Sequence, residues 1–270
     1  MPDQPAPLLS RSQIRKLGSR LRKPDPPTVE DLELLERVRV AYGQILDDVV
    51  RTLFDHGLPS TGRLKTTRTI VEKLRRNPSM GLLTMQDIAG TRIVAEMDRD
   101  EQDGMVERLM GLLQNAEIVD RRANPSFGYR AVHVIAREQG YPVEIQVRTG
   151  LQNAWAQVFE RLADVVGRQI RYGEPLDDPD EEFAGGLTRQ RIVDFFMGLS
   201  EAIDLVEARI VMTKKIEHQI EEHMRQLQDA KGQLQDAKDK FRAAEAELRD
   251  FFGQFGPLAQ APATFRRQPE

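Results

Sequence analysis

The chain has 270 residues, of which 40% are hydrophobic, and a formal net charge of -4 at pH 7. This length and apolar content suffice for one large domain, or for a domain with an extension. The weakly acidic balance gives no global attraction to nucleic acid or acidic membranes, so any site for a polyanion must be local.

The sequence contains no cysteine, which excludes disulfides and thiolate chemistry. Its histidines lack a zinc-binding spacing, so any bound metal would be held by oxygen. We find no apolar run long enough to span a bilayer and no signal peptide. We therefore expect a cytoplasmic protein that makes no membrane contact.

The first part of the chain consists of a basic segment with many prolines, followed by one long helical pattern. Prolines surround a basic segment in residues 1–27, which we expect to form a flexible or loosely helical basic arm. Thr28 followed by Asp31 indicates a helix cap, and apolar residues then repeat at helical spacing up to Gly57. This stripe predicts an amphipathic helix that is buried on one face.

A basic segment follows from Ser60, with a predicted helix whose apolar face contains Ile70, Val71 and Leu74. Basic side chains and free backbone N–H groups at a helix start can collect phosphates. The same charges could equally form a solvated face. The pattern alone leaves both interpretations open.

Asp87 lies before a β-rich run from Thr91 to Ala95, so Asp87 and Arg92 sit at the mouth of a predicted strand. A carboxylate there suits a divalent cation, because Mg²⁺ binds through one or two protein carboxylates plus substrate phosphates. It could also be a helix cap. A further helix is predicted over residues 100–115.

Three more strands are predicted, over residues 116–122, 129–138 and 141–149, and Gln139-Gly140 joins the last two as a hairpin. Tyr129 follows the glycine of a loop and could act as a lid that stacks on a base, or could fill the core. His133 shares a strand face with Tyr129, which fits either a site residue or a structural histidine.

The strand over residues 141–149 carries three polar groups in one row. Glu144, Gln146 and Arg148 alternate with three β-branched residues, so a strand would point them all to one face. A carboxylate, an amide and a guanidinium together can hold a metal, orient a hydroxyl and grip a phosphate. The alternative is an amphipathic strand that faces solvent.

A helix from about Asn153 to Gly167 is followed by an acidic stretch, 171–187, which we expect to be a linker and domain boundary. Residues 188–255 read as a long helical or coiled-coil extension, and 256–270 as a loose tail. Large residues recur at steps of seven: Ile220, Leu227, Leu234, Phe241, Leu248 and Phe255. Alanines occupy most positions of the second row of this heptad pattern. This pattern predicts antiparallel pairing with another segment or another copy, hence a homo-oligomer or a helical partner.

Four blocks in order resemble the synthetase domain of the RelA/SpoT family, in particular the small alarmone synthetases. They are R-x-K followed by T-I-x-x-K-L-x-R at Arg63 to Arg76, D-I-A-G-T-R-I at Asp87 to Ile93, G-Y-R-x-x-H at Gly128 to His133, and E-I-Q-V-R-T with a later N-x-W at Glu144 to Trp155. The resemblance implies an α+β fold over residues 28–170, with a mixed β-sheet flanked by helices as in nucleotidyltransferases.

The resemblance also implies an activity. The family moves the β,γ-pyrophosphate of ATP onto the ribose 3′-hydroxyl of GDP or GTP and makes (p)ppGpp, with Mg²⁺ as cofactor. By position, Arg63 and Arg92 would lie on the two faces of the adenine. The ATP phosphates would lie near four residues, Lys65, Thr69, Lys73 and Arg76.

The same resemblance implies the remaining roles. Asp87 and Glu144 would hold the Mg²⁺, and Glu144 would also be the base for the attacking hydroxyl. The acceptor base would stack on Tyr129, and three residues would line that side, His133, Gln146 and Asn153.

Two departures from the family pattern fall on the acceptor side. The loop before G-Y-R lacks the usual lysine, and the glutamate-histidine pair after the tryptophan is replaced by Phe159-Glu160. A toxic relative that pyrophosphorylates an adenine nucleotide or the 3′ end of tRNA is therefore an alternative, which Arg121-Arg122 also suggests. A non-catalytic module that senses nucleotide is a third possibility. No histidine-rich hydrolase signature is present, so we expect synthesis rather than degradation.

Overall fold

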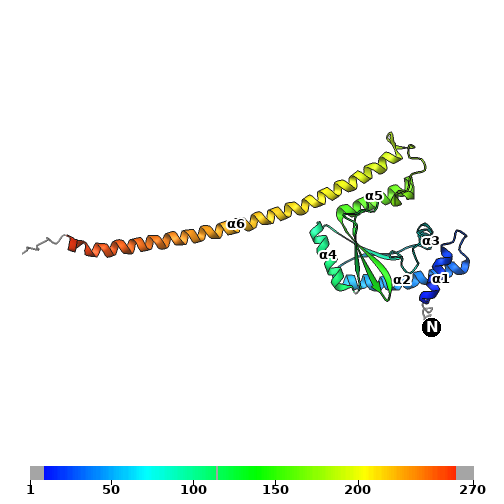
Figure 1. Cartoon of the computed structure of the whole chain (residues 1–270), viewed down its shortest axis with the longest axis horizontal. Coiled ribbons are helices and arrows are strands. Elements are labelled where there is room, and N and C mark those ends of the chain that lie inside the picture. Colours follow the sequence, from blue (N-terminus) through cyan, green and yellow to red (C-terminus); the bar gives the residue numbers. More distant parts are fainter. Residues whose placement is uncertain (1–8, 114, 260–270) are drawn as a thin grey trace, which may run out of the picture. The chain divides into compact units, whose positions relative to one another are not determined.

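The computed structural model of the protein describes residues 9–113 and 115–259. The chain divides into two compact units, and the division falls between Val211 and Met212. The elements, labelled in part in Figure 1, are α1 (Arg11–Leu21), α2 (Val29–Asp55), β1 (Thr61–Leu64), α3 (Thr67–Arg76), β2 (Ala89–Ala95), α4 (Arg99–Leu112), β3 (Glu117–Asp120), β4 (Val132–Glu138), β5 (Tyr141–Thr149), α5 (Gly150–Val166), the 3-10 helix η1 (Arg168–Tyr172), β6 (Glu182–Ala184), β7 (Leu187–Thr188) and α6 (Arg189–Ala259).

The first unit is built on a five-stranded sheet in the order β1-β2-β5-β4-β3. Strands β2 and β5 are parallel, whereas the other neighbours are antiparallel. The predicted α+β class with a mixed sheet is thus confirmed. The β4-β5 hairpin turns at Gln139 and Gly140, which both have positive φ, as the tightest hairpin turns require.

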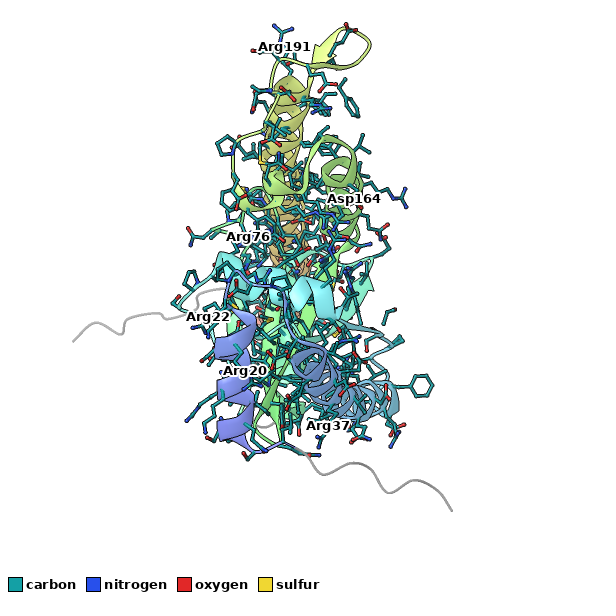
Figure 2. All side chains as sticks on the ribbon, turned by 90° about the vertical axis from the view of Figure 1, so that its right-hand side faces the viewer. Arg20, Arg22, Arg37, Arg76, Asp164 and Arg191 are labelled. Atoms are coloured by element: carbon teal, nitrogen blue, oxygen red, sulfur yellow. The ribbon has the colours of Figure 1, made fainter. Side chains whose placement is uncertain are left out.

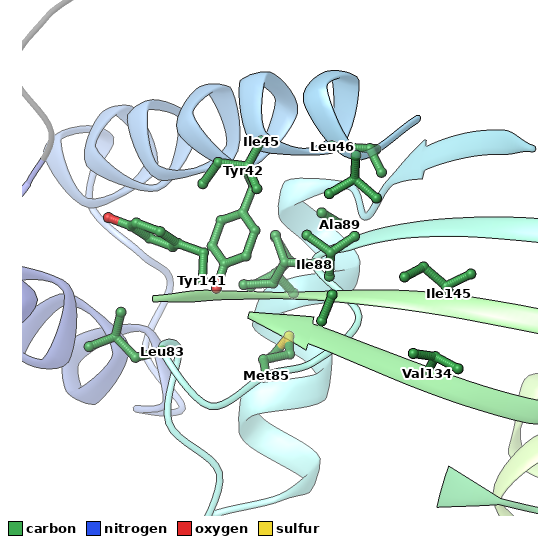
Figure 3. Packing of buried hydrophobic residues seen from close by; sticks show 14 of the residues in the cluster. Tyr42, Ile45, Leu46, Leu83, Met85, Ile88, Ala89, Val134, Tyr141 and Ile145 are labelled. Carbon is green, nitrogen blue, oxygen red and sulfur yellow. The ribbon is translucent and has the colours of Figure 1, made fainter. Parts of the chain in front are cut away.

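Helix α2 covers the sheet with the apolar stripe that the sequence predicts. Thr28 caps it by accepting a hydrogen bond from the backbone N–H of Asp31. Figure 3 shows Tyr42 of α2 against Tyr141 of β5 in the buried core. The ring centroids lie 5.1 Å apart with an edge-on geometry, which aromatic pairs favour. The core therefore fixes α2 on the same strand that carries Glu144.

A second apolar cluster lies between α5 and the first turns of α6. The rings of Trp155 and Phe159 stack at a centroid distance of 4.6 Å, and the indole Nε1 of Trp155 donates to the carbonyl of Phe196 at 2.8 Å. Ile192, Val193 and Met197 also pack on this cluster. The beginning of α6 is therefore part of the first unit.

Three features of the segments outside residues 28–170 differ from the expectations. Residues 11–21 of the expected basic arm form α1, which starts with a capping box at Ser10 and buries Ile14, Leu17 and Leu21. Arg20 and Arg22, both labelled in Figure 2, lie at the end of this segment, and Arg20 binds Asp31 of α2 at 2.7 Å. The apolar residues at helical spacing attach the segment to the core.

The expected linker over 171–187 is not the boundary of the compact unit. It contains the end of η1 and the two-stranded sheet β6-β7, and the unit continues to Val211. The apolar residues at the start of α6 are buried against α5, which explains why the boundary of the unit lies further along the chain than expected. The predicted tail begins within α6, since 256–259 are helical, and 260–270 lie outside the described residues.

The second unit contains the distal part of α6, a single helix of 71 residues in all. The side chains described from residue 212 to 254 are almost all exposed. The side chain of Phe255, the last large residue of the heptad pattern, lies outside the described residues. Among the helices that the structure describes, none combines the length and apolar character needed to cross a membrane.

Candidate active site

A cavity of about 690 Å³ opens over the polar face of the sheet. It is lined by residues of β1, β2, β5, α5 and η1, of the segments on both sides of β1, and of the segment before β2. The lining residues are Pro59, Ser60, Thr61, Arg63, Lys65, Asp87, Gly90, Thr91, Arg92, Val94, Glu144, Gln146, Arg148, Asn153, Gln157, Glu160 and Arg171.

The register of the parallel pair β2-β5 explains this gathering. Gly90 is paired with Glu144, and Arg92 with Gln146. On β5, Val143, Ile145 and Val147 are buried in the core, and the residues between them line the cavity. The predicted polar row on β5 therefore faces a cavity rather than bulk solvent.

Asp87 is the centre of a cationic cluster on one side of the cavity. Its Oδ2 accepts from Lys65 Nζ at 2.8 Å and from Lys73 Nζ at 2.6 Å. Burial alone would raise the pKa of the Asp87 carboxyl, but Lys73 and Lys65 outweigh it and hold the pKa below its ordinary value. The carboxyl is therefore ionised at neutral pH. Its Oδ1 is buried and has no hydrogen-bond partner among the described residues.

Glu144 is held by two hydrogen-bonded chains that both begin at Arg148. In one, Arg148 donates to Gln146 Oε1 at 2.7 Å, and Gln146 Nε2 donates to Glu144 Oε2 at 2.6 Å. In the other, Arg148 donates to the Tyr129 hydroxyl at 3.0 Å, which lies 2.9 Å from His133 Nε2. His133 Nδ1 lies 3.0 Å from Glu144 Oε1.

The direction of both chains is consistent when the proton of the His133 ring is assigned to Nδ1. Every member then donates towards the Glu144 carboxylate. Burial alone would raise the pKa of Glu144, but the hydrogen bonds from His133 and Gln146 hold it below its ordinary value. Glu144 is thus ionised and fixed in orientation.

The structure brings most of the predicted site residues together. Seven of them line the cavity, namely Arg63, Lys65, Asp87, Arg92, Glu144, Gln146 and Asn153. Lys73 reaches it through Asp87, and Tyr129 and His133 through the Glu144 network. Arg92 also lies 3.5 Å from the Asn153 side-chain oxygen. Burial lowers the pKa of Arg92 from its ordinary value, and the nearby charge of Arg148 lowers it further.

Two predicted phosphate contacts are engaged elsewhere. The Thr69 hydroxyl donates to the carbonyl of Thr66 at 2.9 Å, within the first turn of α3. The guanidinium of Arg76, labelled in Figure 2, stacks on the Tyr172 ring, with its central carbon 3.6 Å from the ring centroid. Neither residue is among those that line the cavity.

Several lining residues were not among the site residues that the resemblance implied, and two of them are Arg148 and Arg171. Arg148 is only 2% exposed and links Tyr129 to Gln146. Its place in the alternating row of β5 was the signal, but the row did not reveal its central role. Arg171 comes from η1, beyond the four motifs, and no pattern in the sequence indicated it.

The loop before β4 requires a glycine at position 128. Its φ is +78°, and a Cβ there would lie 2.7 Å from the Trp155 ring. Ser200 of α6 donates to the carbonyl of Gly128 at 2.5 Å. The hydroxyl of Tyr129 is held by Arg148 as described above, so the ring is fixed rather than a free lid.

Comparison with known proteins identifies relatives of this chain. The family model described as "Region found in RelA / SpoT proteins" matches residues 62–163. The uncharacterized protein Rv1366 of Mycobacterium tuberculosis is 36% identical over 221 residues, which cover 77% of this chain and 78% of that protein. GTP pyrophosphokinase YjbM of Bacillus subtilis is 33% identical over 153 residues, 47% of this chain and 72% of that protein.

Solved structures similar to this chain include small alarmone synthetase 1 from Bacillus subtilis. The likeness has 25% sequence identity and a TM-score of 0.47, and covers 67% of this chain and 96% of that one. The structure of the same synthetase bound to pppGpp gives 24% identity and a TM-score of 0.49. On the family match and the identity to the curated relatives, the chain belongs to the RelA/SpoT family.

Proposed function

We propose that the protein transfers the β,γ-pyrophosphate of ATP to the ribose 3′-hydroxyl of GDP or GTP and so makes (p)ppGpp. The observation that carries this proposal is one cavity lined by the carboxylates of Asp87 and Glu144 and by the cations of Arg63, Lys65 and Arg92. Transfer of a phosphoryl-type group requires such charges around the nucleotide. Membership of the RelA/SpoT family and a relative named GTP pyrophosphokinase support the pyrophosphokinase class.

On the donor side, ATP would bind to the basic wall of the cavity. Its adenine would lie between Arg63 and Arg92, and its phosphates would reach Lys65. The Nε of Arg92 is buried and has no hydrogen-bond partner among the described residues, so it is available to a ligand. In this proposal Lys73 acts through Asp87, whereas Thr69 and Arg76 stabilise α3 and its surroundings instead of contacting phosphate.

On the acceptor side, the guanine base would stack near Tyr129, and Glu144 would accept the proton of the 3′-hydroxyl. The bond between O3′ and the β-phosphorus forms, the bond from that phosphorus to the α-phosphate oxygen breaks, and AMP leaves. A carboxylate with a lowered pKa is a weak base for a free alcohol. It is sufficient if the proton leaves late, when bonding to phosphorus has made the hydroxyl acidic.

The residues of the cavity also fit a divalent cation. Among the described residues, no group of three or more histidine and carboxylate side chains could hold a metal. Mg²⁺ needs fewer, since substrate phosphates and water complete its octahedron. Asp87 Oδ1 is buried without a partner, and the negative charges of Asp87 and Glu144 act on each other. These two carboxylates would hold Mg²⁺, which when bound neutralises charge developing on the phosphates.

The metal assignment predicts the effect of Asp87→Asn. We expect the Mg²⁺ concentration for half-maximal turnover to rise at least about tenfold, because the amide removes a negative charge from the site. Binding of Mn²⁺ with a non-hydrolysable ATP analogue, followed by electron paramagnetic resonance, should weaken in parallel. Asp47→Asn, at an exposed position of α2, is the matched control. Unchanged metal dependence of Asp87→Asn would contradict the assignment.

The acceptor is tested by incubating the protein with ATP and Mg²⁺ and, in separate reactions, GDP, GTP, ADP or uncharged tRNA. Separation of the nucleotides should show AMP together with a guanosine product carrying a 3′-pyrophosphate. Modification of ADP or tRNA instead would indicate the toxic relative, and nucleotide binding without turnover a sensing module. Arg122, which suggested tRNA, forms ion pairs with Asp103 at 2.6 Å and with Asp120 at 2.7 Å, so it supports the tRNA alternative less than the sequence suggested.

A further inference from the structure

The distal part of α6 exposes a continuous apolar stripe. Large side chains recur at steps of seven, and we name Leu227, Leu234, Phe241 and Leu248 the leucine row. Leu234 is 56% exposed and Phe241 is 71% exposed. A single-file stripe of this length at heptad spacing is typical of a helix that pairs with another helix.

The second row of the stripe consists mainly of small residues. Three positions later than each of the first three members of the leucine row lie Ala230, Ala237 and Ala244, which we name the alanine row. A parallel partner of the same sequence would place large against large and alanine against alanine in alternate layers. An antiparallel copy with Phe241 against Ala244 also places Leu248 against Ala237, so most layers combine a large and a small residue, and Leu234 with Phe251 is the exception. The side-chain sizes thus favour an antiparallel copy.

Charged residues beside the two rows select one register. In antiparallel pairs, the positions that flank the same row on the two helices face each other. When Phe241 faces Ala244 of the second copy, Lys238 faces Glu245, and each of these pairs occurs twice. The other flank then matches in the same way.

On that other flank, Lys240 faces Glu247 of the second copy, again twice. If the second helix shifts by one heptad in one direction, Lys238 faces Lys238 of the second copy and Lys240 faces Lys240. If it shifts by one heptad in the other direction, Glu245 faces Glu245 of the second copy and Glu247 faces Glu247. Like charges at such positions disfavour pairing, so the charges specify a single register.

Two of these charged residues also have partners within the helix. Lys240 binds Asp236 at 2.8 Å, and Glu245 binds Arg249 at 2.8 Å. Both pairs join exposed side chains four residues apart, and such pairs contribute little. They can be shared or exchanged when a second helix approaches.

We propose that residues 231–254 of α6 pair with the same segment of a second copy, antiparallel and with Phe241 against Ala244. The occupant of the stripe is thus a second copy of this chain, chosen by both volume and charge. This inference does not depend on the catalytic proposal.

The oligomeric state of the full chain tests the proposal. Sedimentation equilibrium should give a dimer or a multiple of it for the wild type, and Leu234→Glu should remove this association. Gln228→Glu adds the same charge to the same exposed helix outside both rows and should leave it intact. A monomeric wild type, or an unchanged mass of Leu234→Glu, would overturn the proposal.

Charge exchange tests the register without altering the apolar rows. Lys238→Glu should raise the dimer dissociation constant by about tenfold or more, because it faces Glu245 of the second copy. Adding Glu245→Lys in the same chain should return the dimer dissociation constant to about the wild-type value. No recovery in the double variant would mean that these residues do not face each other.

Cross-linking tests the direction, since the natural chain has no cysteine. Chains carrying Phe241→Cys mixed with chains carrying Ala244→Cys should form disulfides mainly between unlike chains. Efficient disulfides of Ala244→Cys with itself would instead indicate a parallel pair and overturn the antiparallel register.

Discussion

Glu144→Gln is expected to lower the kcat of pyrophosphate transfer by about two to four orders of magnitude, the usual contribution of a general base. The amide is isosteric but cannot accept a proton at neutral pH. It also presents one N–H₂ group where the carboxylate offers two acceptor oxygens. Either Gln146 or His133 would then face a donor instead of an acceptor, so the network that orients residue 144 would be broken.

The measurement is kcat with saturating ATP and guanine nucleotide, together with the affinity for an ATP analogue. Affinity for the analogue should change less than kcat, because Asp87 and the basic residues of the cavity still bind the nucleotide when the proposed base is lost. Glu107→Gln, an exposed position of α4, serves as the matched control and should behave as the wild type. Undiminished product from Glu144→Gln would remove Glu144 from the chemistry.

Glu207→Ala is expected to cost about 3–5 kcal/mol of the free energy of unfolding, as is usual when one partner of a buried ion pair is removed. Glu207 is 3% exposed, and its carboxylate accepts from three groups. These are Arg99 Nε at 3.0 Å, Thr149 Oγ1 at 2.5 Å and Gln152 Nε2 at 2.9 Å. Thr149 and Gln152 also form the capping box of α5, so the start of that helix loses support.

Urea denaturation of the wild type and of Glu207→Ala at neutral pH measures this loss of stability. Glu201→Ala, an exposed position on the same helix, should stay within about 0.5 kcal/mol of the wild type. Arg99 keeps one partner in the variant, Asp204, which limits the loss towards the lower end of the range. A change below about 1 kcal/mol for Glu207→Ala would mean that Arg99 and the cap compensate fully.

The sequence predicts the part of the site that depends on local pattern. The alternation on β5 assigned Glu144 and Gln146 to one face, and the order of motifs placed Asp87 near them. The parallel pairing of β2 with β5 is what makes these separate motifs one cavity. The alternation of apolar and polar residues over 143–148 carries enough information for such a prediction.

Features that depend on distant partners were not predictable in the same way. Strand β1 has only four residues, including Gly62, and its pairing with β2 defines it. The guanidinium of Arg76 stacks on Tyr172, a residue almost a hundred positions later in the chain, and no local pattern indicates this contact. The sequence allowed a loose helix in the basic arm but did not predict that α1 packs on the core, because basic residues separate its three apolar contacts.

The packing of early α6 on α5 sets a lower limit for a usable fragment of this protein. The region matched by the family model ends at residue 163, whereas Trp155 and Phe159 are covered by side chains from beyond Arg189. A fragment cut at the end of the match would expose these rings and leave Arg130 without Ser200 and Asp204. Expression and crystallisation should therefore begin from a chain that retains the helix at least as far as Val211.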